Sequence, residues 1–343
     1  MNPDSSRIEQ SWPVEGLEQV EHCAYCGSSE RKLAYGDVQD WSFYAAPGRW
    51  NYWDCMQCSS LYLSPRPTPA TIAQAYRMYY THRTDGRRFA SAVEWVKEVM
   101  CNEYWSHELG ANLQPRLHLP PAVRGLLRPL KSRLVEPFET AELLRLPSGR
   151  LMDVGCGNGR MLNIARKLGW AVMGLDSDPG AVRSARERGL DVLPGSYARL
   201  ADFPQQFDCV ICSHVLEHVH EPQDLLTHLF ETLKPGGSLL LSSPNATSPM
   251  RYHFGVNWRG LEAPRHLSIA SVSQLEALLK DCGFTVKHHE LRRFCTAAES
   301  SRIQRRGARV TRSDRSVERR LTASAAPSPE QGYDFAQLVC LRP

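Results

Sequence analysis

The sequence predicts an α/β fold in which a mostly parallel sheet, formed by residues 146–343, follows a small cysteine-rich module and a helical linker. We place the module at 1–68 and the linker, which also serves as a lid, at 69–145. An apolar run at 151–154 enters a glycine-rich turn and then a helical pattern over 160–168, which indicates a buried strand followed by a helix. Two C-x-x-C pairs near the amino terminus indicate the separate module.

Length and composition limit the class of protein. The chain has 343 residues, of which 42% are hydrophobic and 23% are charged, so it is long enough for two domains and too apolar for a disordered chain. Segment 1–13 is polar and lacks the apolar core of a signal peptide. No run approaches the roughly 18 apolar residues that span a bilayer. We therefore expect a cytoplasmic enzyme, and the sequence does not indicate its oligomeric state.

The glycine-rich turn predicts a site for a nucleoside-bearing cofactor. Gly155, Gly157 and Gly159 permit positive backbone angles and let a ligand approach without meeting a Cβ atom. Asp176, at the end of the next predicted strand, can accept hydrogen bonds from two ribose hydroxyls. A dinucleotide fingerprint, G-x-G-x-x-G, requires glycine where this chain has Arg160, so the pattern here is G-x-G-x-G.

This motif, Asp153–Gly159, resembles the first motif of the class I S-adenosylmethionine-dependent methyltransferases. The resemblance covers about residues 145–292 and the last ten, and it implies a Rossmann-like sheet whose last strand, Phe335–Leu341, is antiparallel. Further segments follow in the expected order: a strand at Phe207–His214, a helix at Asp224–Leu233, a turn at 234–237, a strand at Ser238–Ser243, a helix at Ser271–Cys282 and a strand at Phe284–Leu291.

The resemblance also implies which residues hold S-adenosylmethionine. Asp153 orders the glycine loop and reaches the amino group of the donor, and Ser196 follows the third strand, where similar enzymes contact adenine. The usual acidic residue is absent there. The full set of expected cofactor-binding residues is Asp153, Gly155, Cys156, Gly157, Asn158, Gly159, Asp176, Ser177, Ser196 and His214.

Four cysteines are spaced as zinc ligands. The knuckles Cys23–Cys26 and Cys55–Cys58 are each followed by a small residue, and each can present two thiolates to a tetrahedral Zn²⁺. Because no histidine or carboxylate supplies an open coordination position, we expect structural zinc bound by Cys23, Cys26, Cys55 and Cys58. A third pair, Cys209 and Cys212, falls inside a predicted strand, where alternation places the two thiols on opposite faces as core residues.

The amino-terminal module is similar to the zinc-binding domain that precedes the methyltransferase domain in bacterial sugar and polysaccharide-biosynthesis methyltransferases. The segment 61–67 and the tyrosines that follow it carry this resemblance. It implies a small-molecule acceptor, a sugar or a nucleotide-linked sugar that is O- or C-methylated. It also implies acceptor contacts from Tyr76, Tyr79, Tyr80 and Arg265.

A hydroxyl acceptor, or a carbon next to a carbonyl, must lose a proton, which a histidine base can take up. His266, within a segment that resembles an acceptor-lining one, is our first choice for this base, and His218 is the second. His218 equally fits a structural role at the start of a helix. His214, at the end of a strand, is expected to contact the cofactor instead.

Two alternatives stay open, an RNA base methyltransferase and a catalytically silent binding protein. The stretch 292–320 holds ten arginines within a predicted mobile basic insertion at 292–334, and arginine pairs well with phosphate. Residues 1–66, however, carry five basic side chains against nine acidic ones, which argues against RNA tracking by the module. The preserved glycine loop and Asp176 argue against a silent protein.

Overall fold

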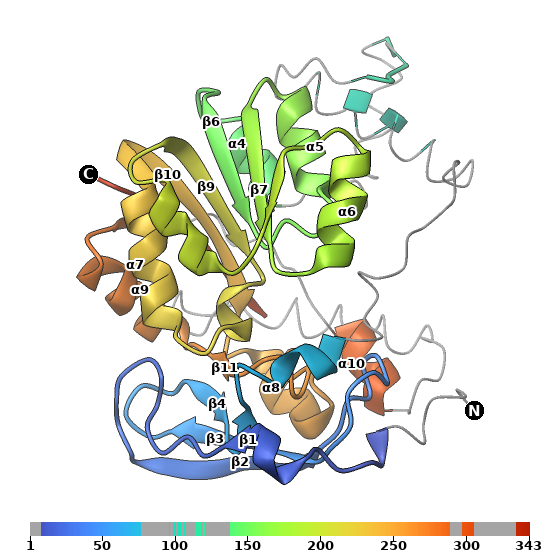
Figure 1. Cartoon of the computed structure of the whole chain (residues 1–343), viewed down its shortest axis with the longest axis vertical. Helices are drawn as coiled ribbons and strands as arrows, with labels where there is room; N and C mark the ends of the chain where they lie inside the picture. The colour runs from blue at the N-terminus through green and yellow to red at the C-terminus, as the bar shows by residue number, and fades with distance from the viewer. Residues whose placement is uncertain are drawn as a thin grey trace.

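The protein consists of two packed bodies, an upper one built on a large sheet and a lower one built on a small sheet (Figure 1). The coordinates are a computed structural model. They describe residues 8–76, 138–288, 297–304 and 334–343, with isolated positions between 96 and 120. Among these residues, no helix is both long and apolar enough to cross a membrane.

The upper body has seven strands in the order β12-β13-β10-β9-β6-β7-β8. All pairs from β10 to β8 are parallel, whereas β13 runs antiparallel to both of its neighbours. The predicted fold class, including the antiparallel last strand, is therefore confirmed. The strands are β6 (Arg150–Val154), β7 (Ala171–Asp176), β8 (Val192–Pro194), β9 (Phe207–Ser213), β10 (Leu233–Pro244), β12 (Thr285–His288) and β13 (Phe335–Leu341).

Helices cover both faces of this sheet, and their ends follow local capping signals. Asp178 caps α6 by accepting from the Gly180 N–H at 2.8 Å, and Ser271 caps α9 by accepting from the Gln274 N–H at 3.3 Å. Pro179, at the first position of α6, supports this cap. The helices are α4 (Phe138–Leu143), α5 (Arg160–Lys167), α6 (Pro179–Glu187), α7 (Pro222–Thr232) and α9 (Val272–Asp281), with short 3₁₀ turns η5 (Tyr197–Asp202) and η6 (Leu216–His218).

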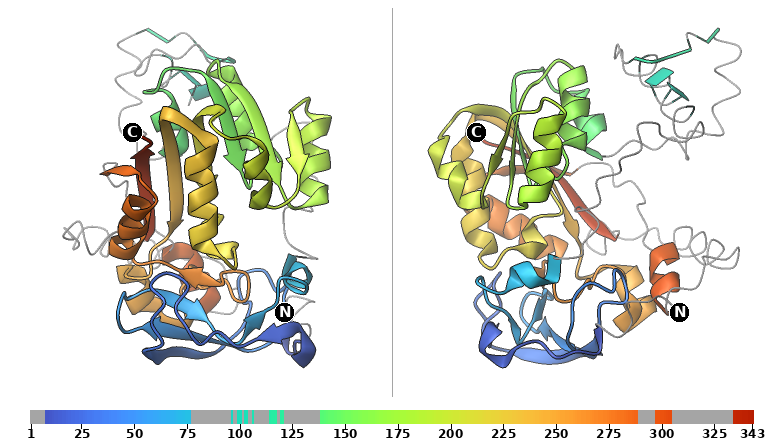
Figure 2. Two further views of the ribbon diagram at one scale, coloured as in Figure 1. Left: turned by 60° about the vertical axis from the view of Figure 1, so that its left-hand side comes forward. Right: turned by 45° about the vertical axis from the view of Figure 1, so that its right-hand side comes forward.

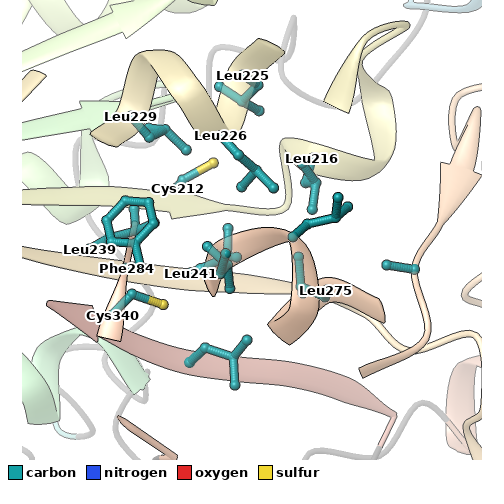
Figure 3. Close-up of a cluster of buried hydrophobic side chains, with 14 of the residues drawn as sticks. Cys212, Leu216, Leu225, Leu226, Leu229, Leu239, Leu241, Leu275, Phe284 and Cys340 are labelled. Carbon is teal, nitrogen blue, oxygen red and sulfur yellow. The ribbon is translucent and has the colours of Figure 1, made fainter. Parts of the chain in front are cut away.

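Strand alternation divides the core of the upper body into two layers. Leucines of α7 and α9 pack with Cys212 on one face, and this layer is drawn in Figure 3. Side chains of α4, α5 and α6 pack with Cys209 on the other face. Both thiols are buried and belong to different layers, so the predicted core role of this C-x-x-C pair is confirmed.

The lower body is the amino-terminal module together with a segment from the second half of the chain. Its sheet has the order β11-β4-β3-β2, and β11 (Ser268–Ile269) pairs antiparallel with β4 (Leu61–Leu63). The other strands are β2 (Arg31–Val38) and β3 (Trp50–Cys55), with a separate ribbon of β1 (Leu17–Glu18) and β5 (Arg66–Pro67) and turns η1 (Val14–Gly16) and η2 (Ile72–Tyr76). The predicted boundary at residue 68 did not anticipate this shared sheet, because a two-residue strand leaves no periodic pattern.

The helices α8 (Pro249–Phe254) and α10 (Ala297–Gln304) and the turn η7 (Gly255–Asn257) pack at the outer side of the lower body (Figure 2). Ser300 and Ile303 of α10 are buried, and Ser300 Oγ accepts from the Arg259 N–H at 3.0 Å. This part of the predicted mobile insertion is therefore a packed helix, with Ser300 and Ile303 on its buried side. Residues 292–296 and 305–333 of that prediction, and most of the predicted linker, lie outside the described residues.

Candidate functional site

The glycine loop between β6 and α5 is packed at its two ends and open at its centre. Gly155, Gly157 and Gly159 have φ values of +72°, +54° and +77°, as the sequence predicted. A Cβ on Gly155 would lie 2.5 Å from Val215, and one on Gly159 would lie 2.3 Å from Leu190. A Cβ on Gly157 would meet nothing within 4 Å. The outer glycines therefore allow close packing, while the central one leaves room for a ligand.

Asp176 holds the loop from the end of β7. Its carboxylate accepts from the Gly157 N–H at 2.7 Å and from the Asp178 N–H at 2.8 Å. Burial raises the pKa of Asp176, although these two N–H groups act in the opposite direction. A carboxylate has about four acceptor positions, so two bonds to the backbone leave capacity for ligand hydroxyls.

A pocket of about 250 Å³ adjoins the loop and is acidic. Burial, together with Glu139 and Asp176, raises the pKa of Asp153 well above its usual value. Glu139, on α4, accepts from Ser213 Oγ at 2.6 Å. Neither Asp153 nor Glu139 pairs with a lysine or an arginine in the part of the chain that the structure describes, so the pocket suits a cationic group. Its lining is Glu139, Asp153, Gly155, Cys156, Arg160, Met161, Ile211 and Ser213.

Sequence reasoning missed Glu139. It lies within the region predicted as a linker, on a six-residue helix that precedes β6 and carries no motif. The pairing of β6 with β9 places Ser213 beside the pocket. The hydrogen bond from Ser213 to Glu139 then holds α4 against the pocket.

The other expected cofactor residues surround the loop. Cys156 is buried, whereas Asn158, Ser177 and Ser196 are exposed. His214 follows β9 with a φ of +55°, and its Nδ1 lies 3.1 Å from Glu217 Oε1. Their predicted contacts with a cofactor remain predictions.

Two predicted histidines and one predicted tyrosine come together beyond the carboxyl end of β9, and we name this group the histidine–tyrosine cluster. His218 Nδ1 lies 3.0 Å from the Tyr76 hydroxyl and 3.0 Å from the Arg265 carbonyl oxygen. The rings of His218 and His266 meet edge to face with centroids 4.6 Å apart. His266 Nδ1 donates to the Gly260 carbonyl oxygen at 2.6 Å, and burial lowers the pKa of His266 to about 4.

Arg265, predicted to bind the acceptor, is instead a buried structural residue. Its guanidinium is fully buried and pairs with Asp40 at 2.7 Å and Glu262 at 3.0 Å. It also donates to the Ala75 carbonyl oxygen at 3.1 Å. These partners occupy the donors, so the side chain presents no surface to a substrate. Tyr79 and Tyr80 lie outside the described residues.

The four cysteines of the two knuckles form a compact cluster, with all sulfur atoms within 4.8 Å of one another. Two of the separations are 3.7 Å (Cys23–Cys58) and 3.4 Å (Cys26–Cys55). Tetrahedral zinc with bonds of about 2.3 Å requires sulfur atoms about 3.8 Å apart, so the donor set fits this ion. The hydrogen bond with Cys23 lowers the pKa of Cys58 to about 5, which favours a thiolate.

Both knuckles have the same turn. The N–H groups of Gly27 and Ser59 donate to the carbonyl oxygens of Cys23 and Cys55, and both residues have positive φ values, +74° and +58°. The turns are attached to the upper body, since Ser271 Oγ donates to the Cys58 carbonyl oxygen at 2.6 Å. Gln274 of α9 also donates to the carbonyl oxygen of Tyr25, inside the first knuckle, at 3.0 Å.

Comparison with known proteins identifies the upper body. A protein-family model described as a methyltransferase domain matches residues 123–289. The ubiquinone biosynthesis O-methyltransferase of Xanthomonas campestris is 36% identical over 114 residues, which cover 31% of this chain and 48% of that protein. Residues 123–289 of this chain therefore match a methyltransferase domain. The prediction of this enzyme class is confirmed at the level of the domain.

Other relatives of the methyltransferase domain show the extent of the match. The mitochondrial ubiquinone biosynthesis O-methyltransferase of Schizosaccharomyces pombe is 35% identical over 107 residues, 29% of this chain and 39% of that protein. The match thus spans about half the length, or less, of these relatives. A solved methyltransferase structure from Archaeoglobus fulgidus aligns over 63% of this chain and 99% of its own, with 20% identity and a TM-score of 0.41.

Replacing Gly157 by alanine tests whether the open loop of the methyltransferase domain holds the donor. Gly189 has a similar φ of +70° and is equally free of neighbours, so Gly189→Ala controls for backbone strain. We expect both variants to lose about 1 kcal/mol of stability. Only Gly157→Ala should lose affinity for S-adenosylhomocysteine, by at least about tenfold in calorimetric titration. Equal affinities in the two variants would contradict the assignment.

The acidic pocket makes a second prediction for this domain. If Glu139 and Asp153 receive the ammonium group of the donor, Glu139→Gln should bind S-adenosylhomocysteine about 10- to 100-fold more weakly, because a charge-assisted hydrogen bond is lost. Binding of 5′-methylthioadenosine, which has no ammonium group, should not change. Glu142→Gln, on the same helix but paired with Arg145, is the control. A parallel loss of affinity for both ligands would refute the ammonium site.

Proposed function

We propose that the protein transfers a methyl group from S-adenosylmethionine to a hydroxyl group of a small molecule bound at the histidine–tyrosine cluster. The observation that carries this proposal is the position of the cluster beside the glycine loop. Val215, which precedes η6, packs against Gly155 of the loop. Burial is the main cause of the raised pKa of Tyr76; the charge of Arg265 opposes it, and those of Glu262, Glu217 and Asp176 add to it. The expected donor and acceptor sites are therefore neighbours.

The donor, when bound, supplies a methyl group on a positively charged sulfur. In this proposal Asp176 and the open amide edge of the glycine loop hold its nucleoside part, while Asp153 and Glu139 receive its ammonium group. The loop is fixed before binding, because Asp176 already accepts from two backbone N–H groups. The protein thus contributes mainly position, which is the principal requirement for a displacement between two bound partners.

We propose His218 as the group that takes the proton from the acceptor. The Arg265 carbonyl oxygen can only accept, so it fixes the hydrogen of His218 on Nδ1 and leaves Nε2 as the basic nitrogen. His218 is half-buried, whereas His266 is almost fully buried. This difference favours His218 over His266, the reverse of the order expected from the sequence.

Two acceptor classes share the required hydroxyl group. The resemblance of the amino-terminal module favours a sugar or nucleotide-linked sugar. The similarity to O-methyltransferases of ubiquinone biosynthesis favours a phenol. We rank the sugar first. The partial matches to those relatives do not account for the lower body, and the lower body contributes Tyr76 to the cluster. RNA ranks below both, because the module is net acidic.

We also propose that the four cysteines bind structural zinc, which joins the two knuckles and holds the module against α9. Cys55→Ser should reduce the zinc content from about one ion per chain to near zero and destabilise the protein by several kcal/mol, since metal binding contributes folding free energy. Zinc can be measured by mass spectrometry and stability by denaturant unfolding. Cys282→Ser, outside the cluster, is the control. A full zinc content in Cys55→Ser would exclude this site.

Methyl transfer is tested with labelled donor and a panel of nucleotide sugars, phenols and RNA, followed by mass spectrometry of the products. With the accepted substrate, His218→Asn should reduce kcat by roughly 100-fold, within the range of general-base catalysis, and leave S-adenosylhomocysteine affinity unchanged. His253→Asn, an exposed histidine of α8, should have full activity. Labelling of RNA alone, or full activity in His218→Asn, would overturn the proposal.

A further inference from the structure

A buried carboxylate lies beside the histidine–tyrosine cluster and has not been assigned a role. Glu217 is fully buried in η6, the turn that follows β9. Its Oε2 accepts from Ser243 Oγ at 3.1 Å, and its Oε1 lies 3.1 Å from His214 Nδ1. The contact with His214 is an ion pair when that imidazole is protonated, and within the described part of the chain Glu217 pairs with no lysine or arginine. A buried carboxylate of this kind is commonly compensated by hydrogen bonds and a cation.

Donor atoms from three residues converge at this carboxylate. One oxygen of Glu217, one nitrogen of His218 and one nitrogen of His266 lie within 4.8 Å of one another. Metal–ligand bonds of about 2.1 Å place donor atoms about 3 to 4 Å apart, so a small contraction would bring these three onto one ion. Glu217 and His218 come from η6, whereas His266 comes from the segment that leads into β11.

The two imidazoles are oriented as metal ligands are. In each ring, Nδ1 faces a backbone carbonyl oxygen: that of Arg265 for His218, at 3.0 Å, and that of Gly260 for His266, at 2.6 Å. A carbonyl oxygen cannot donate, so both rings carry hydrogen on Nδ1 and have a lone pair on Nε2. Metal-binding histidines characteristically donate their second ring N–H to such an acceptor.

We propose that Glu217, His218 and His266 bind one divalent transition-metal cation at the acceptor site. This inference rests on the proposed function, because the acceptor is placed at the same cluster. Two imidazoles and one carboxylate suit Mn²⁺, Fe²⁺ or Zn²⁺ and leave coordination positions for oxygen ligands. The site differs in chemistry from the cysteine cluster, whose thiolates select soft or borderline ions.

Cation binding changes how the acceptor loses its proton. With the ion bound, the imidazoles are ligands and no longer proton acceptors. The ion would supply Lewis acidity, which would lower the pKa of the acceptor hydroxyl so that water could take its proton before the oxygen attacks the methyl group. Without the ion, His218 acts directly as the base. If the ion activates the acceptor, methyl transfer should require the metal; if His218 is the direct base, methyl transfer should not require it.

The binding test uses the full chain with its cysteine site loaded with Zn²⁺, titrated with Mn²⁺ and followed by electron paramagnetic resonance of free Mn²⁺. Mn²⁺ favours nitrogen and oxygen donors over thiolates, so it reports on the proposed site. We expect one bound ion in the unmodified protein and at least about tenfold weaker binding in Glu217→Gln, which keeps the shape of the side chain. His218→Asn, a less buried position, should show the same loss.

Two matched variants control for surface binding, Glu231→Gln and His253→Asn, both at exposed positions. Calorimetric titration with S-adenosylhomocysteine confirms that each variant is folded. An unmodified protein that binds no Mn²⁺, or equal binding in Glu217→Gln and the unmodified protein, would overturn the cation site. Full methyl transfer after selective removal of this ion would also overturn its role and leave His218 as the direct base. Mn²⁺ binding without methylation of any acceptor would support the cation site and reject the proposed function.

Discussion

The position of the histidine–tyrosine cluster depends on one buried ion pair, between Arg265 and Asp40. The guanidinium and the carboxylate are both fully buried, with contacts of 2.7 and 3.0 Å. Asp40 also accepts from the N–H groups of Ala45 and Ala46, so the charge is distributed over several hydrogen bonds. Removing one partner of such a pair leaves a buried charge, which typically costs about 3–5 kcal/mol.

The same arginine contacts each segment that forms the cluster. Its side chain donates to the carbonyl oxygen of Ala75, next to Tyr76, and its own carbonyl oxygen faces His218. Its neighbour in the chain is His266. The ion pair lies within the lower body, whereas His218 belongs to the upper body, so both bodies contribute to the cluster. The cysteine knuckles form a second contact between the two bodies, because Ser271 and Gln274 donate hydrogen bonds to their carbonyl oxygens.

Features set by local chemistry could be predicted from the sequence. The glycine loop, the helix after it, the cap at Asp178 and the opposite faces of Cys209 and Cys212 all follow from neighbouring residues and strand alternation. Features set by distant contacts could not be predicted. Asp40 and Arg265 are 225 positions apart, and β11 has only two residues, so neither leaves a periodic signal. Glu139 likewise reaches the acidic pocket only through its contact with Ser213 of β9, which is 74 positions away in the sequence.

The expected donor site could be predicted from the sequence more fully than the proposed acceptor site, because different parts of the chain form them. The family match covers residues 123–289, which contain the glycine loop and Asp176, so the donor side is shared with many relatives. Tyr76 and Asp40 lie outside that match, in the module that contributes to the proposed acceptor site. A fold carries many functions by changing the residues around a common site. In the proposed function, acceptor choice would therefore depend on the module and on the long-range contacts that hold it, rather than on the motifs shared with other methyltransferase domains.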